Sequence, residues 1–285
     1  MASARRAFAC TRYGLYKLLS KPKLLAALLF MYLYMDNHLD AISAFLTQYG
    51  EKVNGFGLFS QLLADPYFVL VAGLVLLLIL GDAPFYDGAQ CAVLLRAGRM
   101  PWLIGQIGYI MVVTGLYLVA LILLQHVVLN GQVEYAKHWG RALNTLAKPS
   151  VAMEHGVTAP IYEGIVTNWT VRRCFALSMT LRWVAYVITA LIMFAVNLRW
   201  RGYLGVFFAL VVLLMDIVIE TGMPYALYIA SISSLARLSI LDFGYNPYLP
   251  DAEISMTVLS LAFFGAIALA LLVGRKSELA QKSDG

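Results

Sequence analysis

Residues 82–108 read DAPFYDGAQCAVLLRAGRMPWLIGQIG and form a polar interruption between two strongly apolar runs. Asp82 is a residue type that caps helix N-termini, and Pro84 suits the first helical turn. Gly98 is placed to end this helix, and Pro101 to begin the next one. Between these ends, apolar side chains adjoin charged ones: Asp87, Val93, Leu94, Leu95, Arg96, Arg99. The stretch therefore predicts a short helix at a membrane surface, with an apolar side toward the bilayer.

The composition indicates a polytopic membrane protein. The 285 residues have a mean hydropathy of +0.76, with 61% hydrophobic and 13% charged residues, far from the averages of soluble domains. The net charge of +5 does not indicate nucleic-acid binding, because the basic residues stand at the ends of apolar runs. Cys10 and Cys91 fall on one predicted side of the membrane and Cys174 near the other, so no disulfide framework is expected.

Six apolar stretches are candidate transmembrane helices: residues 24–42, 66–80, 102–129, 174–198, 203–219 and 254–273. The first is the weakest, because its unbroken apolar part is 12 residues, about 18 Å of helix against a hydrocarbon core of roughly 30 Å. Residues 1–23 are basic and amphipathic, and we expect them to form a helix on the inner leaflet that ends at Pro22. A cleaved signal peptide is not expected here, because a longer apolar run follows without a cleavage site.

Two further segments have a mixed character. Residues 130–173 form a polar loop, in which four apolar residues at helical spacing predict an amphipathic surface helix: Tyr135, Trp139, Leu143, Leu146. Residues 223–241 are apolar but contain Pro224, three serines and Arg237. They indicate a re-entrant or surface helix, and a seventh span is the alternative.

The distribution of basic residues predicts that both termini are cytoplasmic. Thirteen lysines and arginines fall on the side of the termini and seven on the other, although the other side offers more loop sequence. A seventh span would move Arg275 and Lys276, in the tail of residues 274–285, to the outside, against this rule. The 82–100 segment then faces the cytoplasm, where it offers a docking surface for a soluble partner.

Three charged residues lie inside predicted spans: Arg182 in the fourth, Asp216 and Glu220 in the fifth. Their matching depths predict an ion pair between Arg182 and one of the two carboxylates. Two interpretations remain open. The pair is either a structural device that compensates charge in lipid, or part of a substrate path or a gate.

The sequence contains no pattern typical of an enzyme or a cofactor site. The four histidines, His38, His126, His138 and His155, are dispersed without metal-ligand spacing. No nucleophile elbow or phosphate-binding loop is present. We therefore expect no catalytic residue, no metal and no cofactor bound by this chain.

Several motifs across most of the chain resemble the permease subunits of type-2 ATP-binding-cassette exporters of Gram-positive bacteria. These motifs are DPYF at 65–68, GDAPFYD at 81–87, LRAGR at 95–99, WLIGQ at 102–106, WG at 139–140, NTLA at 144–147 and SLARL at 234–238. Asp87 departs from the pattern, since many such permeases have a glutamate there.

The resemblance implies a single transmembrane domain over residues 1–285, with six spans, an elbow helix at 1–23, a cytoplasmic coupling helix within 82–100 and re-entrant structure before the last span. Such permeases act in the plasma membrane as pairs of identical or different chains, driven by separate ATPase subunits that hold ATP and Mg²⁺. It implies ATPase contacts at the coupling residues Phe85, Tyr86, Asp87, Leu94, Arg96 and Arg99.

The expected function is export of an amphipathic peptide or a lipid-like compound. The alternatives are an ion-coupled secondary transporter and an intramembrane enzyme, each using the charges of Arg182, Asp216 and Glu220. An internal repeat typical of secondary transporters is not visible, and no nucleophile or metal cluster accompanies the three charges.

Overall fold

The computed structural model describes residues 2–83, 88–200, 204–241 and 249–276. The fold is all-α, as predicted, and 81% helical. In chain order the elements are α1 (Ala2–Leu19), α2 (Pro22–Tyr49), β1 (Val53–Asn54), α3 (Gly55–Leu62), α4 (Pro66–Leu80), α5 (Gly88–Ala97), α6 (Arg99–Val128), β2 (Val133–Glu134), α7 (Gly140–Leu146), α8 (Pro149–Glu154), α9 (Glu163–Asn168), α10 (Val171–Arg199), α11 (Leu204–Glu220), the 3-10 helix η1 (Tyr225–Ala230), α12 (Ile232–Leu235), the 3-10 helix η2 (Leu238–Ile240) and α13 (Ala252–Lys276).

The long helices make this a membrane protein. Among the described residues, α6, α10 and α13 are each long and apolar enough to cross a bilayer. The pairs α1–α2 and α3–α4 also qualify if each is one broken span, and their bends are 67° and 85°. Candidate spans thus number three, or up to five, within the described parts of the chain.

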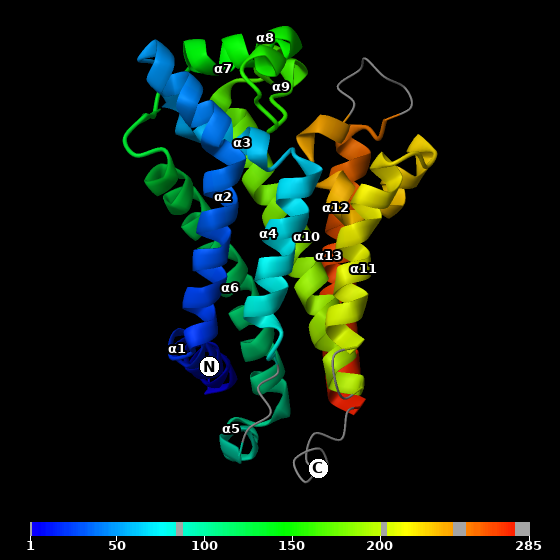
Figure 1. The fold of residues 1–285 in the computed structure, drawn as a ribbon. Coiled ribbons are helices and arrows are strands. Elements are labelled where there is room, and N and C mark those ends of the chain that lie inside the picture. Colours follow the sequence, from blue (N-terminus) through cyan, green and yellow to red (C-terminus); the bar gives the residue numbers. More distant parts are fainter. Residues whose placement is uncertain (1, 84–87, 201–203, 242–248, 277–285) are drawn as a thin grey trace.

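The elements separate into two ends (Figure 1). The short helices α7, α8 and α9 gather at one end, which we call the α7 end, and α1, α5 and the close of α13 lie at the other, the α5 end. Between them α2, α4, α6, α10, α11 and α13 run alongside one another. The polar loop 130–173 and α5 are therefore at opposite ends, as the sequence predicts.

Helix α1 forms where the basic amphipathic helix is expected, and Pro22 begins α2. One side of α1 packs against α6 at a glycine: Thr11 Oγ1 donates to the carbonyl oxygen of Gly105 at 2.9 Å. A Cβ at Gly105 would lie 2.5 Å from Cβ of Cys10, so this approach requires glycine. Another side leaves Phe8, Tyr16 and Leu19 exposed.

The weakest predicted span lies inside a longer helix. α2 has 28 residues and is about 42 Å long at 1.5 Å per residue. It continues through the polar residues Asp36 to Asp40 and ends at Gly50, whose φ of 62° closes the helix with a hydrogen bond to the Leu46 carbonyl. Burial of Met31, Met35 and Leu39 shows the side that packs on the core.

The helix expected over residues 135–146 is shorter than predicted. α7 begins only at Gly140, which has a φ of 81°. The preceding residues form no helix, because β2 pairs in parallel with β1 and Asn54 Nδ2 donates to the carbonyls of Ala136 and His138. Leu143 and Leu146 are buried as expected, whereas Tyr135 is 53% exposed.

The segment 223–241 is not one helix. It consists of η1, α12 and η2, three short pieces that fold back beside α11 (Figure 1). Pro224 precedes η1 and Ser231 lies between η1 and α12, whereas Ser233 and Ser234 lie within α12. Ser231 caps α12 by accepting a hydrogen bond from the N–H of Ser234.

Candidate functional site

The candidate site is a buried charge network near the α7 end of α11. Asp216 and Glu220 are one helical turn apart and face the same way. The side chain of Asp216 is 2% exposed and that of Glu220 is 39% exposed. Two carboxylates at this depth require compensating charge or hydrogen-bond donors.

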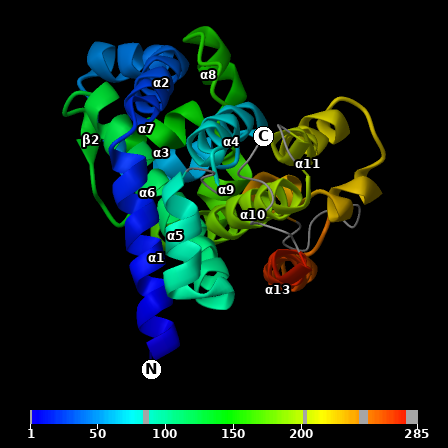
Figure 2. The same cartoon turned by 90° about the horizontal axis from the view of Figure 1, so that it is seen from below.

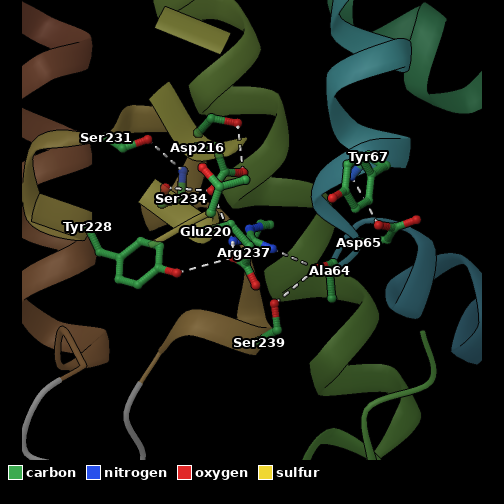
Figure 3. Close-up of polar contacts among 12 residues, drawn as sticks. Ala64, Asp65, Tyr67, Asp216, Glu220, Tyr228, Ser231, Ser234, Arg237 and Ser239 are labelled. Atoms are coloured by element: carbon green, nitrogen blue, oxygen red, sulfur yellow. Dashed lines mark hydrogen bonds and ion pairs between the residues drawn. The ribbon is translucent and has the colours of Figure 1, made fainter. Parts of the chain in front are cut away.

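Arg237, just after α12, supplies the compensating charge (Figure 3). Its Nη2 lies 2.9 Å from Oδ1 of Asp216 and 2.7 Å from Oε2 of Glu220, and its side chain is fully buried. The two carboxylates therefore share one guanidinium. The direct pairing with Arg182 that matching depths predict is replaced by pairing with Arg237, because the folded-back segment brings that arginine against α11.

Arg182 of α10 reaches Asp216 only through a serine. Its Nη1 donates to Oγ of Ser233 at 3.3 Å, and this hydroxyl donates to Oδ2 of Asp216 at 3.5 Å. The neighbouring Ser234 donates to Oδ1 of Asp216 at 2.6 Å. Arg182 and Asp216 are thus two ends of one polar chain, each almost completely buried.

The same two arginines donate hydrogen bonds to backbone carbonyls at the break between α3 and α4. Pro66 has no N–H, and the N–H of Tyr67 donates to Oδ1 of Asp65, so helical donors for the preceding carbonyls are lost. Arg182 Nη2 donates to the Leu63 oxygen at 3.3 Å. Arg237 Nη1, at 3.5 Å, and Ser239 Oγ, at 2.9 Å, donate to the Ala64 oxygen. The network therefore joins α10, α11, the 231–239 segment and the α3–α4 break.

A second polar contact adjoins this break. Nε2 of His38, on α2, lies 3.0 Å from Oδ2 of Asp65, without hydrogen-bond geometry. The His38 ring stacks on Tyr34 with centroids 5.6 Å apart, and on Phe68 at 6.0 Å. The polar part of the weakest predicted span therefore faces a buried carboxylate.

The loop at the α7 end covers the network. Gln61 of α3 binds the backbone of Tyr162 twice: Oε1 accepts its N–H at 3.0 Å and Nε2 donates to its carbonyl at 3.4 Å. Burial raises the pKa of the Tyr162 phenol, although Arg237 and Ser239 oppose the increase. A neutral phenol thus lies beside the arginine. From the other side, the hydroxyl of Tyr228 donates to Oε2 of Glu220 at 3.1 Å (Figure 3).

The network balances two guanidiniums against two carboxylates. No group of three histidine, cysteine or acidic residues that could hold a metal occurs among the described residues. The arginines are bound to carboxylates, serines and carbonyls. The arrangement can hold four segments together, and it can separate them only if several polar contacts break at once.

Sequence reasoning missed Arg237, Ser233 and Ser234. The available signal was an arginine and adjacent serines inside an otherwise apolar stretch, a pattern that marks polar groups requiring partners. The sequence places Arg237 in the polar part of the 223–241 segment and among the outer basic residues, but it predicts no carboxylate partner for it.

The residues of the predicted coupling segment have diverse surroundings. Phe85, Tyr86 and Asp87 lie outside the described residues. Leu94 is half-buried against the core, Leu95 is 87% exposed, and Arg96 is exposed. Arg99 Nε donates to the Gly274 carbonyl at 2.8 Å, which ties the start of α6 to the close of α13.

Gly98 ends α5 as predicted, with a φ of 83°. Asp82, expected as a helix cap, instead contacts Lys21 and Lys23 through Oδ2, and α5 begins at Gly88. Burial alone raises the pKa of Asp82, but the hydrogen bonds and charges of the two lysines outweigh it and lower this pKa.

No family model, no curated protein and no solved structure matches this chain.

Proposed function

We propose that the chain is the membrane-spanning permease subunit of an ATP-binding-cassette transporter that exports an amphipathic peptide or a lipid-like compound. ATP and Mg²⁺ are bound by a separate ATPase subunit, and this chain has no nucleotide site of its own. Two permease chains, identical or different, act together in the plasma membrane with their termini in the cytoplasm.

The observation that carries the proposal is the position of α5 and its packing against α1 and α6. This short helix lies between α4 and α6 in the chain, at the α5 end of the molecule, and packs beside α1 and α6 (Figure 2). It leaves Leu95 almost fully exposed. A push on α5 would move the start of α6, and through the Arg99 hydrogen bond also the close of α13. This packing would transmit a movement of a bound ATPase from α5 to the membrane-spanning helices α6 and α13.

The motifs support the finer architecture in this proposal. α1 is the elbow helix, and residues 82–100 are the coupling segment. The six spans are α2, α3–α4, α6, α10, α11 and α13, with residues 223–241 re-entrant between the last two. α11 has 17 residues, about 26 Å of helix, which suffices for most of a bilayer core when residues on either side complete the crossing.

The alternatives use the buried charges for proton coupling or chemistry. Both are less well supported, because Asp216 is bound by an arginine and two serines. An ion-coupled site would need a carboxylate that can gain and release a proton from a water-filled path. We therefore interpret the network as a structural element that holds α10, α11 and the α3–α4 break together during a transport cycle.

The test replaces Leu95 with glutamate and measures association with an ATPase subunit. Leu95→Glu places a charge on an exposed side chain, so folding should be unaffected, while an apolar docking contact would be weakened about tenfold or more. Met153→Glu is the matched control, since Met153 is 80% exposed on α8 at the opposite end.

The readout is the amount of an ATPase chain, identified by its phosphate-binding loop, that co-purifies with the tagged protein, together with ATP hydrolysis by the complex. The proposal predicts loss of both for Leu95→Glu and retention for Met153→Glu. Equal recovery from both variants would rule out docking through α5.

A further inference from the structure

A pocket of about 290 Å³ lies between α1 and α5. Arg6, Ala9, Cys10 and Tyr13 line it from α1, and Val93, Arg96 and Ala97 from α5. Cys10 and Ala97 are buried, so the floor is apolar, whereas both arginines are exposed at the rim. The volume is near the lower end of the range for ligand pockets, roughly 300–1,000 Å³.

The charge of the pocket is positive and uncompensated within the described residues. Neither Arg6 nor Arg96 has an ion pair or a hydrogen-bonding partner there, and the lining contains no carboxylate. α1 itself carries arginines and a lysine but no acidic residue. An occupant with an anionic group and an apolar portion would match both the rim and the floor.

The position of α1 makes this pocket accessible to a membrane lipid. Phe8, Tyr16 and Leu19 are each more than 70% exposed on the side of α1 turned away from α6. A helix with such a side and a basic flank lies in the interfacial region of a bilayer. Inner-leaflet phospholipids with negative headgroups attract such basic segments. Figure 2 shows α1 and α5 side by side.

We propose that the α1–α5 pocket binds the headgroup of an anionic phospholipid from the leaflet at the α5 end. Arg6 and Arg96 hold the phosphate from two helices, and the glycerol and upper acyl chain lie over Ala9, Tyr13 and Val93. The bound lipid fastens α5 to α1. The proposal is independent of the ATPase, since only this chain and the membrane take part.

The experiment reconstitutes the purified full chain, without any partner, into vesicles of phosphatidylcholine containing a photoreactive phosphatidylglycerol. After illumination, the labelled peptides are identified by mass spectrometry. A photoreactive phosphatidylcholine in matched vesicles measures contact that is independent of charge. Labelling by the anionic probe is expected within residues 6–13 and 93–97.

Two pairs of substitutions separate the pocket from general surface charge. Arg6→Gln with Arg96→Gln should reduce labelling by the anionic probe about tenfold. Arg5→Gln with Arg12→Gln also removes two positive charges, both from α1 and both outside the pocket lining, and should change labelling less than about twofold. Both proteins should elute and melt like the parent chain.

Equal losses in the two double variants would overturn the proposal in favour of diffuse attraction to the surface. Unchanged labelling of the Arg6 and Arg96 variant, together with lost ATPase association, would overturn it in favour of a protein partner. If Leu95→Glu leaves ATPase co-purification unchanged, the docking proposal is refuted but the lipid-labelling result is not affected. The two proposals can therefore be refuted independently.

Discussion

Replacing Arg237 with methionine should destabilise the protein more than any other single change in the charge network. The substitution removes the guanidinium that lies 2.9 Å from Asp216 and 2.7 Å from Glu220. Asp216 then keeps only its serine donors in a site where its side chain is 2% exposed. The Ala64 carbonyl still accepts from Ser239, so the main cost is the buried, unpaired carboxylate.

The magnitude follows from the burial of the two carboxylates. Breaking a buried ion pair by removing one partner costs about 3–5 kcal/mol. Glu220 is 39% exposed, so water replaces its partner and its share is below about 1 kcal/mol. At roughly 2–4 °C per kcal/mol for a chain of this size class, Arg237→Met should lower the melting temperature by on the order of 10 °C.

A second substitution should restore most of the loss. Asp216→Asn removes the charge that Arg237→Met leaves unpaired, so the double variant should lie within about 2 kcal/mol of the parent protein. Asp216→Asn alone should cost less than Arg237→Met, because Arg237 keeps Glu220 as its partner. Glu220→Gln should cost less still.

The assay is thermal unfolding of the purified protein in one detergent at a fixed heating rate, because membrane proteins often unfold irreversibly. Intrinsic fluorescence and retention of the monodisperse peak report the loss of structure. An Arg237→Met protein that melts within 3 °C of the parent would refute the reasoning. So would a double variant less stable than Arg237→Met.

Two further predictions concern the α5 end. Gly105→Leu should displace α1 from α6, because even a Cβ would approach the Cys10 Cβ to 2.5 Å; maleimide labelling of Cys10, which is 4% exposed, should then accelerate. Gly265→Leu is the control, since no atom lies within 4 Å of its added Cβ, and equal labelling of both variants would contradict the prediction. Asp82→Asn should lower the melting temperature at neutral pH. The advantage of the parent protein should disappear as pH falls below the ordinary carboxyl pKa of 3.8, because stability from a carboxylate with a lowered pKa is lost on its protonation. A pH-independent difference would exclude the ion pairs as its cause.

Local features of the fold were predictable because their causes are local. Pro22 begins a helix since its ring fixes φ and its missing N–H is not needed there. Gly98 ends α5 since it adopts a φ of 83° without steric cost. The long apolar runs became helices because backbone groups in lipid must be satisfied within the segment.

Errors arose where distant segments meet. Tyr135 and Trp139 had helical spacing with Leu143, but the carbonyls of Ala136 and His138 between them accept hydrogen bonds from Asn54, more than eighty residues away, and this stretch is not helical. The spacing of apolar residues reports amphipathicity and carries no information about such a competing partner.

The candidate site was also predictable only in part. Depth within the spans identified Asp216 and Glu220 as carboxylates that need a cation, and Arg182 as the buried arginine nearest in depth. The structure assigned them to Arg237, because the chain reverses after α11 and inserts 231–239 beside it. Arg182 instead donates to the Leu63 carbonyl at the α3–α4 break and to Ser233.

The sequence by itself determined that this chain is a helical membrane protein, which apolar runs form its long helices, and that three charges inside these runs must be compensated. These properties follow from transfer free energies and from the φ preferences of single residues, which need no knowledge of neighbours in space. Only the tertiary structure decided which arginine pairs with which carboxylate and how sharply the chain bends between α1 and α2 and between α3 and α4. It also decided that α1 and α5 enclose a basic pocket. Each of these depends on contacts between residues far apart in the chain, and many pairings of similar chemistry compete until packing selects one.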